Sequence, residues 1–167
     1  MDHFALPDDP LARALADGTM ERNFQGYSTA AGDALLAFGI SGISQLPSVY
    51  MQDIKALPPY YECLDQGQLP VFRGYVLDDD DLLRRDVIMQ MMCRFEIDRL
   101  QVSLAQDIDF DDVFADAIAE LEPALKDGLL TDDGRYLRAT EIGRYFVRNL
   151  AMPFDRYLSA APTMPMY

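Results

Sequence analysis

The chain has 167 residues, half of them hydrophobic, which is enough for one domain or for one domain with an appendage. Its 28 acidic and 14 basic residues give a formal net charge of −14, so the surface should repel nucleic-acid phosphates and anionic membranes. No run approaches the ~20 apolar residues of a membrane span, the first residues lack a signal-peptide pattern, and two cysteines make no disulfide framework. We therefore expect a cytoplasmic protein that binds neither nucleic acid nor membrane.

The first forty residues are predicted to contain one helix and one strand. Asp9-Pro10 is typical of a helix start, because aspartate caps backbone N–H groups and proline fits the first turn. Asp17-Gly18 is typical of a helix end. Residues 19–34 have the pattern of loops and short turns. The continuous apolar run over residues 34–40 favours a short, buried parallel strand.

The middle of the chain holds the strongest helical pattern. Ser48 can cap a helix that runs to Gln66, and Pro58-Pro59 should kink it because proline removes a backbone donor. Residues 71–77 favour a short strand. The clearest helix is predicted over residues 78–97, where apolar residues recur at helical spacing. This stripe consists of Leu82, Val87, Met91 and Phe95, widened by Leu83, Ile88 and Met92.

The last third is predicted to run helix, hairpin, helix, after an unassigned stretch over 100–108. Asp109 caps a helix over 110–127, and two apolar runs around an Asp-rich turn favour a β-hairpin over 129–138. Thr140 caps a final helix that ends near Leu150. This order predicts an α+β fold that is mainly α with small β content, a helical bundle with a winged-helix-like β-hairpin. The inward residues of the first helix are Phe110, Val113, Phe114, Ala117, Ile118, Leu121 and Leu125.

Two segments combine glycine with amide and hydroxyl side chains beside apolar ones. The first covers residues 22–29 (RNFQGYST) and the second covers residues 38–44 (FGISGIS). Glycine allows positive φ or close backbone approach. A mostly apolar wall with a few placed polar groups is typical of a ligand site. Both segments are therefore candidate binding loops.

These segments resemble the later part of oxygen-independent coproporphyrinogen III oxidases, a family of radical S-adenosylmethionine (SAM) enzymes of haem biosynthesis. The resemblance covers nearly the whole chain, and its segments occur in the family's order. They are residues 1–9 (MDHFALPDD), 23–27 (NFQGY), 39–44 (GISGIS), 72–75 (FRGY), 84–88 (RRDVI), 140–144 (TEIGR), 148–150 (RNL) and 154–158 (FDRYL). The family also contains haem-transfer relatives, but the residue pattern of the first two segments is similar to that of the oxidase branch.

The resemblance implies a SAM cofactor and a [4Fe–4S] cluster in an intact enzyme that converts two propionates of coproporphyrinogen III to vinyl groups, giving protoporphyrinogen IX. Such clusters need cysteine thiolates, usually three in this class. The chain has only Cys63 and Cys93, so it cannot hold the cluster alone. We therefore interpret it as a C-terminal portion of the enzyme that contains no catalytic or metal-ligating residue. It should be inactive by itself and retain neither cofactor.

The resemblance also implies site residues. Gln25 and Ile43 fall on positions where the family contacts SAM, so they are the predicted cofactor-binding residues. Arg22 could pair with a propionate of the substrate, since arginine binds carboxylates with two hydrogen bonds. For Arg22, a solvated loop arginine is the more common situation, and the same holds for Arg73 and the Arg84-Arg85 pair.

The implied organisation has three parts. Residues 1–47 are a remnant of an incomplete (β/α) barrel with SAM-contacting loops, residues 48–158 are the helical C-terminal domain, and residues 159–167 are a mobile tail. The barrel remnant could mediate a homodimer, because unpaired strand edges and apolar patches attract partners. A porphyrin- or haem-binding carrier and a stand-alone interaction module stay open as alternative functions.

The remaining conspicuous residues have structural explanations. His3 is a lone histidine without a partner motif, so it gives weak evidence for a base or a metal ligand. Methionines and a cysteine over residues 89–93 fit core filling better than a haem pocket. The acidic runs at 78–81, 107–112 and 132–133 lack the spacing of a calcium loop and fit helix capping and turns. The hairpin and the last helix belong to a strongly acidic chain, so we do not expect them to bind DNA.

Overall fold

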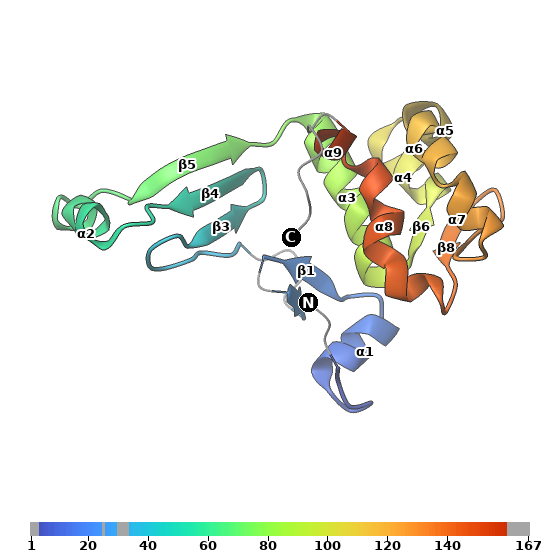
Figure 1. Cartoon of the computed structure of the whole chain (residues 1–167), viewed down its shortest axis with the longest axis horizontal. Helices are drawn as coiled ribbons and strands as arrows, with labels where there is room; N and C mark the ends of the chain where they lie inside the picture. Colours follow the sequence, from blue (N-terminus) through green and yellow to red (C-terminus); the bar gives the residue numbers. More distant parts are fainter. Residues whose placement is uncertain (1–3, 25, 30–33, 160–167) are drawn as a thin grey trace. The chain divides into compact units, whose positions relative to one another are not determined.

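The computed structural model describes residues 4–24, 26–29 and 34–159, and it divides into two compact units that meet between Leu82 and Leu83 (Figure 1). Both units mix helices and strands, so the α+β class is confirmed, with more β structure than we expected. Within the described residues, no helix is long and apolar enough to cross a membrane.

The first unit begins with the predicted helix and an unpredicted hairpin. Helix α1 (Pro10–Ala16) starts where we expected, because the Asp9 carboxylate accepts a hydrogen bond of 2.8 Å from the backbone N–H of Leu11. Strands β1 (Glu21–Asn23) and β2 (Gly26–Ser28) then form an antiparallel hairpin within the stretch that we had assigned to loops. Three-residue strands are too short for a period to be visible in sequence.

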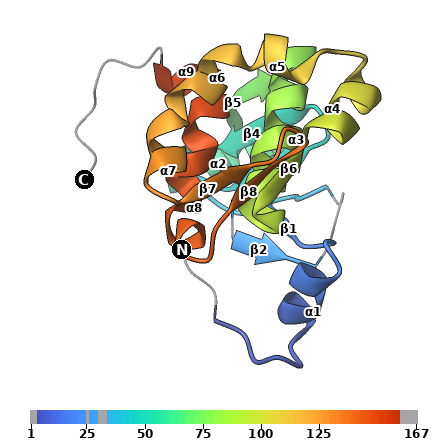
Figure 2. The ribbon, with the colours of Figure 1, turned by 90° about the vertical axis from the view of Figure 1, so that its right-hand side faces the viewer.

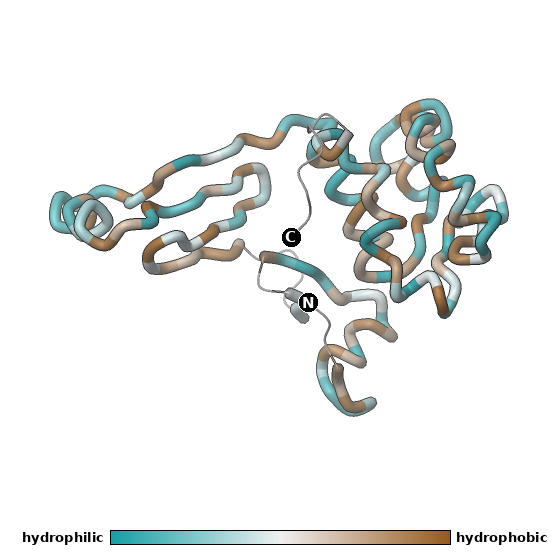
Figure 3. Tube along the Cα trace, viewed as in Figure 1, coloured by the Kyte–Doolittle hydropathy of each residue, from teal (hydrophilic) through white to brown (hydrophobic). Residues whose placement is uncertain are grey.

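The rest of the first unit is an antiparallel sheet with one helix. Strands β3 (Ile43–Leu46), β4 (Val49–Asp53) and β5 (Val71–Val76) pair in the order β3-β4-β5, and α2 (Leu57–Asp65) links the last two. In Figure 3, hydrophobic and hydrophilic residues are mixed along these elements. Strand β5 confirms the strand predicted over 71–77.

Two predictions for this unit were wrong. Residues 34–40 form no strand, and only an isolated antiparallel bridge joins Leu35 to Gln45. Ser48 lies in the turn between β3 and β4 and does not cap a helix. The helix starts at Leu57 instead, with Pro58 in its first turn, where a missing N–H costs no hydrogen bond. The expected domain boundary after residue 47 falls inside this β3–β4 turn.

The second unit surrounds a small sheet with helices. Helix α3 (Asp79–Arg94) confirms the strongest helical prediction but ends earlier, because Phe95 adopts a positive φ of 60°. Strand β6 (Glu96–Asp98) and helix α4 (Arg99–Gln106) occupy the stretch that had no clear pattern. The hairpin β7 (Leu130–Asp132) and β8 (Tyr136–Ala139) is confirmed, and β6 extends it to the order β6-β8-β7 (Figure 2).

Both predicted helices around the hairpin are broken into pieces. The first becomes α5 (Phe110–Val113), α6 (Ala115–Glu120) and α7 (Glu122–Lys126), with Pro123 in the first turn of α7. The second becomes the 3-10 helix η1 (Gly143–Phe146) and α8 (Val147–Ala151), followed by η2 (Met152–Phe154) and α9 (Arg156–Ser159). The predicted cap Asp109 is confirmed, whereas the N-cap position of η1 is Ile142 and not the predicted Thr140. The Asp109 carboxylate accepts from two backbone N–H groups, and Thr140 Oγ1 accepts from the Gly143 N–H at 3.0 Å.

An aromatic cluster forms the centre of the second unit. Phe110, Phe114 and Phe154 are fully buried, with ring centroids of Phe114 and Phe154 5.4 Å apart. Met91 and Cys93 of α3 are buried as well, which confirms core filling as their role. Val113 was wrongly assigned to the core, since it is exposed at the end of the short α5. Residues 83–159 therefore have a core of their own.

Candidate functional site

A strained turn leads into β3 and carries the predicted site residue Ile43. Gly39 and Ser41 both adopt positive φ, of 105° and 57°, and the Gly42 N–H donates to the Gly39 carbonyl at 3.2 Å. The Ser41 N–H donates to the carbonyl of Ile54 at 2.9 Å. Positive φ is costly for serine, so these contacts must hold the turn in place. We call residues 39–44 the glycine turn.

Two side-chain hydroxyl groups hold the glycine turn, one on α2 and one within the turn itself. The Tyr60 hydroxyl on α2 accepts a hydrogen bond of 3.0 Å from the Gly39 N–H. The Ser44 hydroxyl, which is buried, accepts one of 3.0 Å from the Ala37 N–H. Each hydroxyl oxygen takes the place of a backbone carbonyl acceptor, because no neighbouring strand supplies one here. The turn is therefore pre-organised by polar contacts.

Gly42 lies in a closely packed position. An added Cβ would lie 3.0 Å from Ala37 Cβ and 3.1 Å from the Gly39 carbonyl oxygen. The Asp53 carboxylate faces the same point, and burial raises the pKa of this carboxyl above its usual value. The chain's own atoms fill the space beside Gly42. Gly42 therefore serves the shape of the turn, and this space is not available to a ligand.

Strand alternation separates the two faces of the sheet. Ser44 and Asp53 lie on the face that supports the glycine turn, and both are buried. Ile43 lies on the opposite face, directly across from Gln52 on β4. Gln52 is in turn paired with Arg73 on β5, and the Arg73 Nε donates to the Gln52 Oε1 at 2.9 Å. Thus Ile43, Gln52 and Arg73 form a row across three neighbouring strands.

The β1–β2 hairpin lies on the same side as this row. The ring of Phe24, at the hairpin tip, packs edge-on against Tyr50 with centroids 5.4 Å apart. Tyr50 shares its sheet face with Gln52 by strand alternation. The tip of the first predicted binding loop therefore contacts β4, the strand that pairs with Ile43 of the second. Gln25 itself lies outside the described residues, as does His3.

Arg22 points back onto its own hairpin. Its guanidinium lies over the ring of Tyr27, 5.7 Å from the centroid, and these two residues are cross-strand partners. Its buried Nε has no hydrogen-bond partner among the described residues. Desolvating a charged donor without a partner is costly, which is consistent with a ligand or further residues completing this position.

Sequence reasoning undervalued Arg73 and did not single out Gln52 or Tyr60. Arg73 was treated as a solvated arginine, because nothing in the local sequence shows which side chains lie beside it. Only the register of β3, β4 and β5 places it in one row with Ile43. Arg84 has a structural role instead, since it donates to the Phe154 carbonyl at 3.2 Å and lies over the Phe114 ring.

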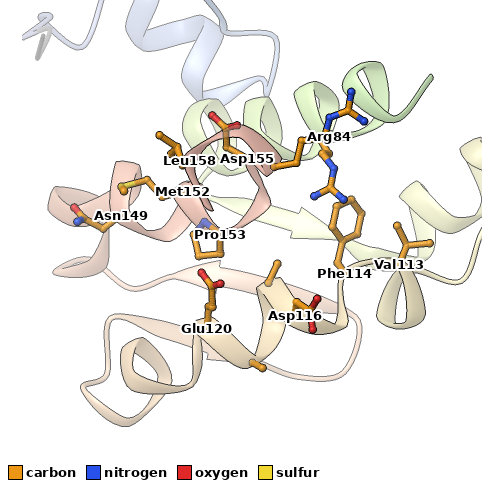
Figure 4. A pocket seen from close by; sticks show the side chains of 13 residues that line it. Arg84, Val113, Phe114, Asp116, Glu120, Asn149, Met152, Pro153, Asp155 and Leu158 are labelled. Atoms are coloured by element: carbon orange, nitrogen blue, oxygen red, sulfur yellow. The ribbon is translucent and has the colours of Figure 1, made fainter. Parts of the chain in front are cut away.

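The second unit contains a separate open pocket of about 760 Å³. Figure 4 shows Asp116 and Glu120 of α6 on one side and Met152 and Pro153 of η2 on the other. Arg84 closes part of the wall. The lining mixes carboxylates, guanidinium groups and apolar atoms, which marks no single ligand chemistry.

The part of the chain that follows the candidate site matches a known domain family. Residues 77–146 match the HemN C-terminal domain family. The match begins at the end of β5 and includes α3 to η1.

Over its whole length the chain resembles particular enzymes. It is 43% identical to the oxygen-independent coproporphyrinogen III oxidase of Synechocystis and 41% identical to that of Escherichia coli, covering 100% of this chain and 37% and 36% of those proteins. A solved structure, titled as the coproporphyrinogen III oxidase (HemN) of Escherichia coli, a radical SAM enzyme, matches with a TM-score of 0.89. That match has 42% identity and covers 94% of this chain and 36% of that one. The chain thus spans about a third of the relatives' length and corresponds to the C-terminal region of this enzyme family.

The described residues do not fit an iron–sulfur cluster. Cys63 is partly exposed on α2 and Cys93 is buried on α3, and the two belong to different units. No group of three histidine, cysteine or acidic residues that could hold a metal occurs in the described parts of the chain. Since a cluster of this kind needs several thiolates at one place, its ligands must come from other residues.

Proposed function

We propose that this chain acts as part of an oxygen-independent coproporphyrinogen III oxidase, whose cluster is held by residues outside it. The observation that carries this proposal is the match to the Escherichia coli enzyme structure over 94% of the chain, at 42% identity. The identity of 42% supports the proposal beyond the likeness in fold, since fold alone would not establish a function. The enzyme would convert two propionates of coproporphyrinogen III to vinyl groups in the cytoplasm.

In this proposal the first unit contributes to the wall of the SAM site. Ile43 would pack against the adenosine part, and Gln25 would hydrogen-bond its polar groups. Ile43 is suited to this because it is only half-buried at the start of β3, on the sheet face away from the buried Ser44. The pre-organised glycine turn would fix its position and so lower the entropy lost on binding.

The second unit would cover the active-site cleft and exclude water during the reaction. Its own aromatic core gives it the rigidity that a covering domain needs. The β6-β8-β7 sheet with α8 is the arrangement that we interpret as winged-helix-like, used here for docking. Residues 1–47 would adjoin the incomplete (β/α) barrel that the rest of the enzyme supplies.

A chimaera tests the function. The aligned region of the Escherichia coli enzyme is replaced by this chain, the cluster is reconstituted, and the loss of carbon dioxide from coproporphyrinogen III is measured. We expect an active chimaera and an inactive isolated chain. A chimaera that folds and holds its cluster, but does not decarboxylate the substrate, would contradict the proposal. Activity in the isolated chain would show that the cluster-bearing part is dispensable.

The SAM contact is tested in the same chimaera. Ile43→Ala should weaken SAM binding by about tenfold, because burying an isoleucine against the ligand is worth about 1.5–3 kcal/mol at most. Leu69→Ala is the matched control, since Leu69 is a highly exposed aliphatic residue of the same unit. Calorimetric titration with SAM measures both. Equal affinities for the two variants would remove Ile43 from the SAM site.

A further inference from the structure

The row across the sheet ends in Arg73. Residues 1–82 contain four lysines and arginines against thirteen acidic residues. Among the residues that the structure describes, however, Arg73 forms no ion pair, and its recorded partner is the neutral side chain of Gln52.

The hydrogen bond to Gln52 orients the guanidinium. It uses the Arg73 Nε–H and the Gln52 Oε1, at 2.9 Å. The two terminal nitrogens of Arg73 then form a fork directed away from Gln52, and the Gln52 amide nitrogen stays available as a further donor. A fork of two parallel N–H groups matches the two oxygens of a carboxylate. We call these two residues the Gln52–Arg73 pair.

Aromatic and apolar groups flank the pair on the same sheet face. Tyr50 and Tyr75 are directly opposed partners two positions along β4 and β5, and Phe24 packs on Tyr50. On the other flank, Ile43 is directly opposed to Gln52. Tyr75 is 46% exposed and Phe24 is 55% exposed, so this apolar surface is open to a ligand. A donor pair within such a surface suits a ligand with an apolar body and a carboxylate.

We infer that the Gln52–Arg73 pair binds a carboxylate of the substrate, a propionate of the tetrapyrrole, beside the predicted SAM contact at Ile43. The inference rests on the proposed function for the identity of the substrate. SAM also has a carboxylate, but it is a small polar amino-acid group, whereas the aromatic flank favours a propionate on a large apolar ring. The pair therefore positions a substrate side chain next to the cofactor wall.

The test measures binding to the chain itself, so that it is independent of catalysis. Coproporphyrin III, the stable oxidised form with four propionates, is titrated into the chain while its Soret absorption is followed. SAM is titrated by calorimetry into the chimaera, because the isolated chain is expected to retain no SAM. Arg73→Gln and Arg73→Lys should each weaken coproporphyrin binding, by about tenfold for the loss of a charge-assisted fork and by less for lysine. Gln52→Glu should weaken it similarly, because the new carboxylate pairs with Arg73 and repels the ligand.

Arg13→Gln is the matched control, since Arg13 is an exposed arginine of α1 in the same unit, and it should bind like the parent. Unchanged coproporphyrin affinity in the Arg73 and Gln52 variants overturns the inference, and so does a parent chain that binds no coproporphyrin. Weakened SAM binding with unchanged coproporphyrin binding assigns the pair to SAM and also overturns it. An inactive chimaera together with Arg73-dependent binding would reject the proposed function while leaving the carboxylate site standing.

Discussion

The two units of this chain differ in how they are stabilised. In residues 83–159, large side chains such as Phe110, Leu137 and Phe154 are almost completely inaccessible to solvent. In the described part of residues 1–82, the buried apolar side chains are only Ala14, Met20, Tyr60 and Pro70. All six residues of β5 are exposed. The second unit is thus held by a hydrophobic core, and the first by backbone pairing and a few polar contacts.

This difference matches the roles that we propose. A domain with its own core can act as a rigid cover, whereas a thin sheet with exposed apolar and aromatic faces is suited to contacts with a ligand or another protein segment. The residues that we propose to contact ligands, Ile43, Gln52 and Arg73, all lie in the first unit.

The largest expected effect tests the core of the second unit. Phe154→Ala should lower the free energy of unfolding by about 3–5 kcal/mol, because it leaves a cavity among Phe110 and Phe114. Phe72→Ala, at a side chain that is 62% exposed on β5, should change it by less than about 0.5 kcal/mol. Urea denaturation followed by circular dichroism measures both. Similar losses in the two variants would remove the contrast between the units.

A steric substitution gives the next largest effect. An added Cβ on Gly143 would lie 1.8 Å from the Leu129 carbonyl oxygen, so Gly143→Ala must displace backbone. We expect a loss of about 1–3 kcal/mol or more in the free energy of unfolding. Gly128→Ala is the control, because its Cβ meets open space and only its φ of +71° is unfavourable. Its cost should stay near 1 kcal/mol. Thermal unfolding of both variants would show whether close packing or backbone conformation matters more here.

A smaller effect tests the polar contacts of the first unit. Tyr60→Phe removes the acceptor of the Gly39 N–H and should cost about 1 kcal/mol locally. The Gly39 amide should then exchange its hydrogen faster, which NMR can follow. Tyr61→Phe is the matched control, since the neighbouring Tyr61 is 57% exposed. Unaltered exchange at Gly39 in the Tyr60 variant would mean that other contacts hold the glycine turn.

The smallest effect concerns acid stability of the second unit. The hydrogen bond from Arg135 is the largest cause that lowers the pKa of Asp98 to about 2, aided by the backbone N–H of Gln101. Because this pKa lies below its ordinary value of 3.8, the stabilisation is complete above that pH and is lost as the pH falls toward 2.

Arg135→Gln should raise the pKa of Asp98 toward its ordinary value and cost no more than about 1 kcal/mol at neutral pH, as expected for a partly exposed pair. An NMR titration of the Asp98 carboxyl checks the shift, with Arg94→Gln at an exposed position of α3 as the control. If both variants leave the carboxyl titrating near pH 2, then the backbone donors dominate.

The sequence predicted elements well where the signal was local. Asp9 and Asp109 cap helices as expected, and the long amphipathic pattern of α3 was correctly identified. Prediction from the sequence failed around Ser48, where a proline and a capping residue resemble a helix start but belong to a turn between strands. The site shows the same division, because the segments that carry Gln25 and Ile43 were found by resemblance, whereas Gln52 and Tyr60 had no local signal.

The sequence by itself determined the caps, the main helix, the hairpin of the second unit, the family and the lack of enough cysteines for a cluster. These depend on residue type, or on spacing within one segment. Only the tertiary structure decided which side chains share a surface, because that depends on the register between strands far apart in the chain. Ile43 and Arg73 are thirty residues apart, yet both are aligned with Gln52, so that one face of a three-stranded sheet becomes a candidate binding surface.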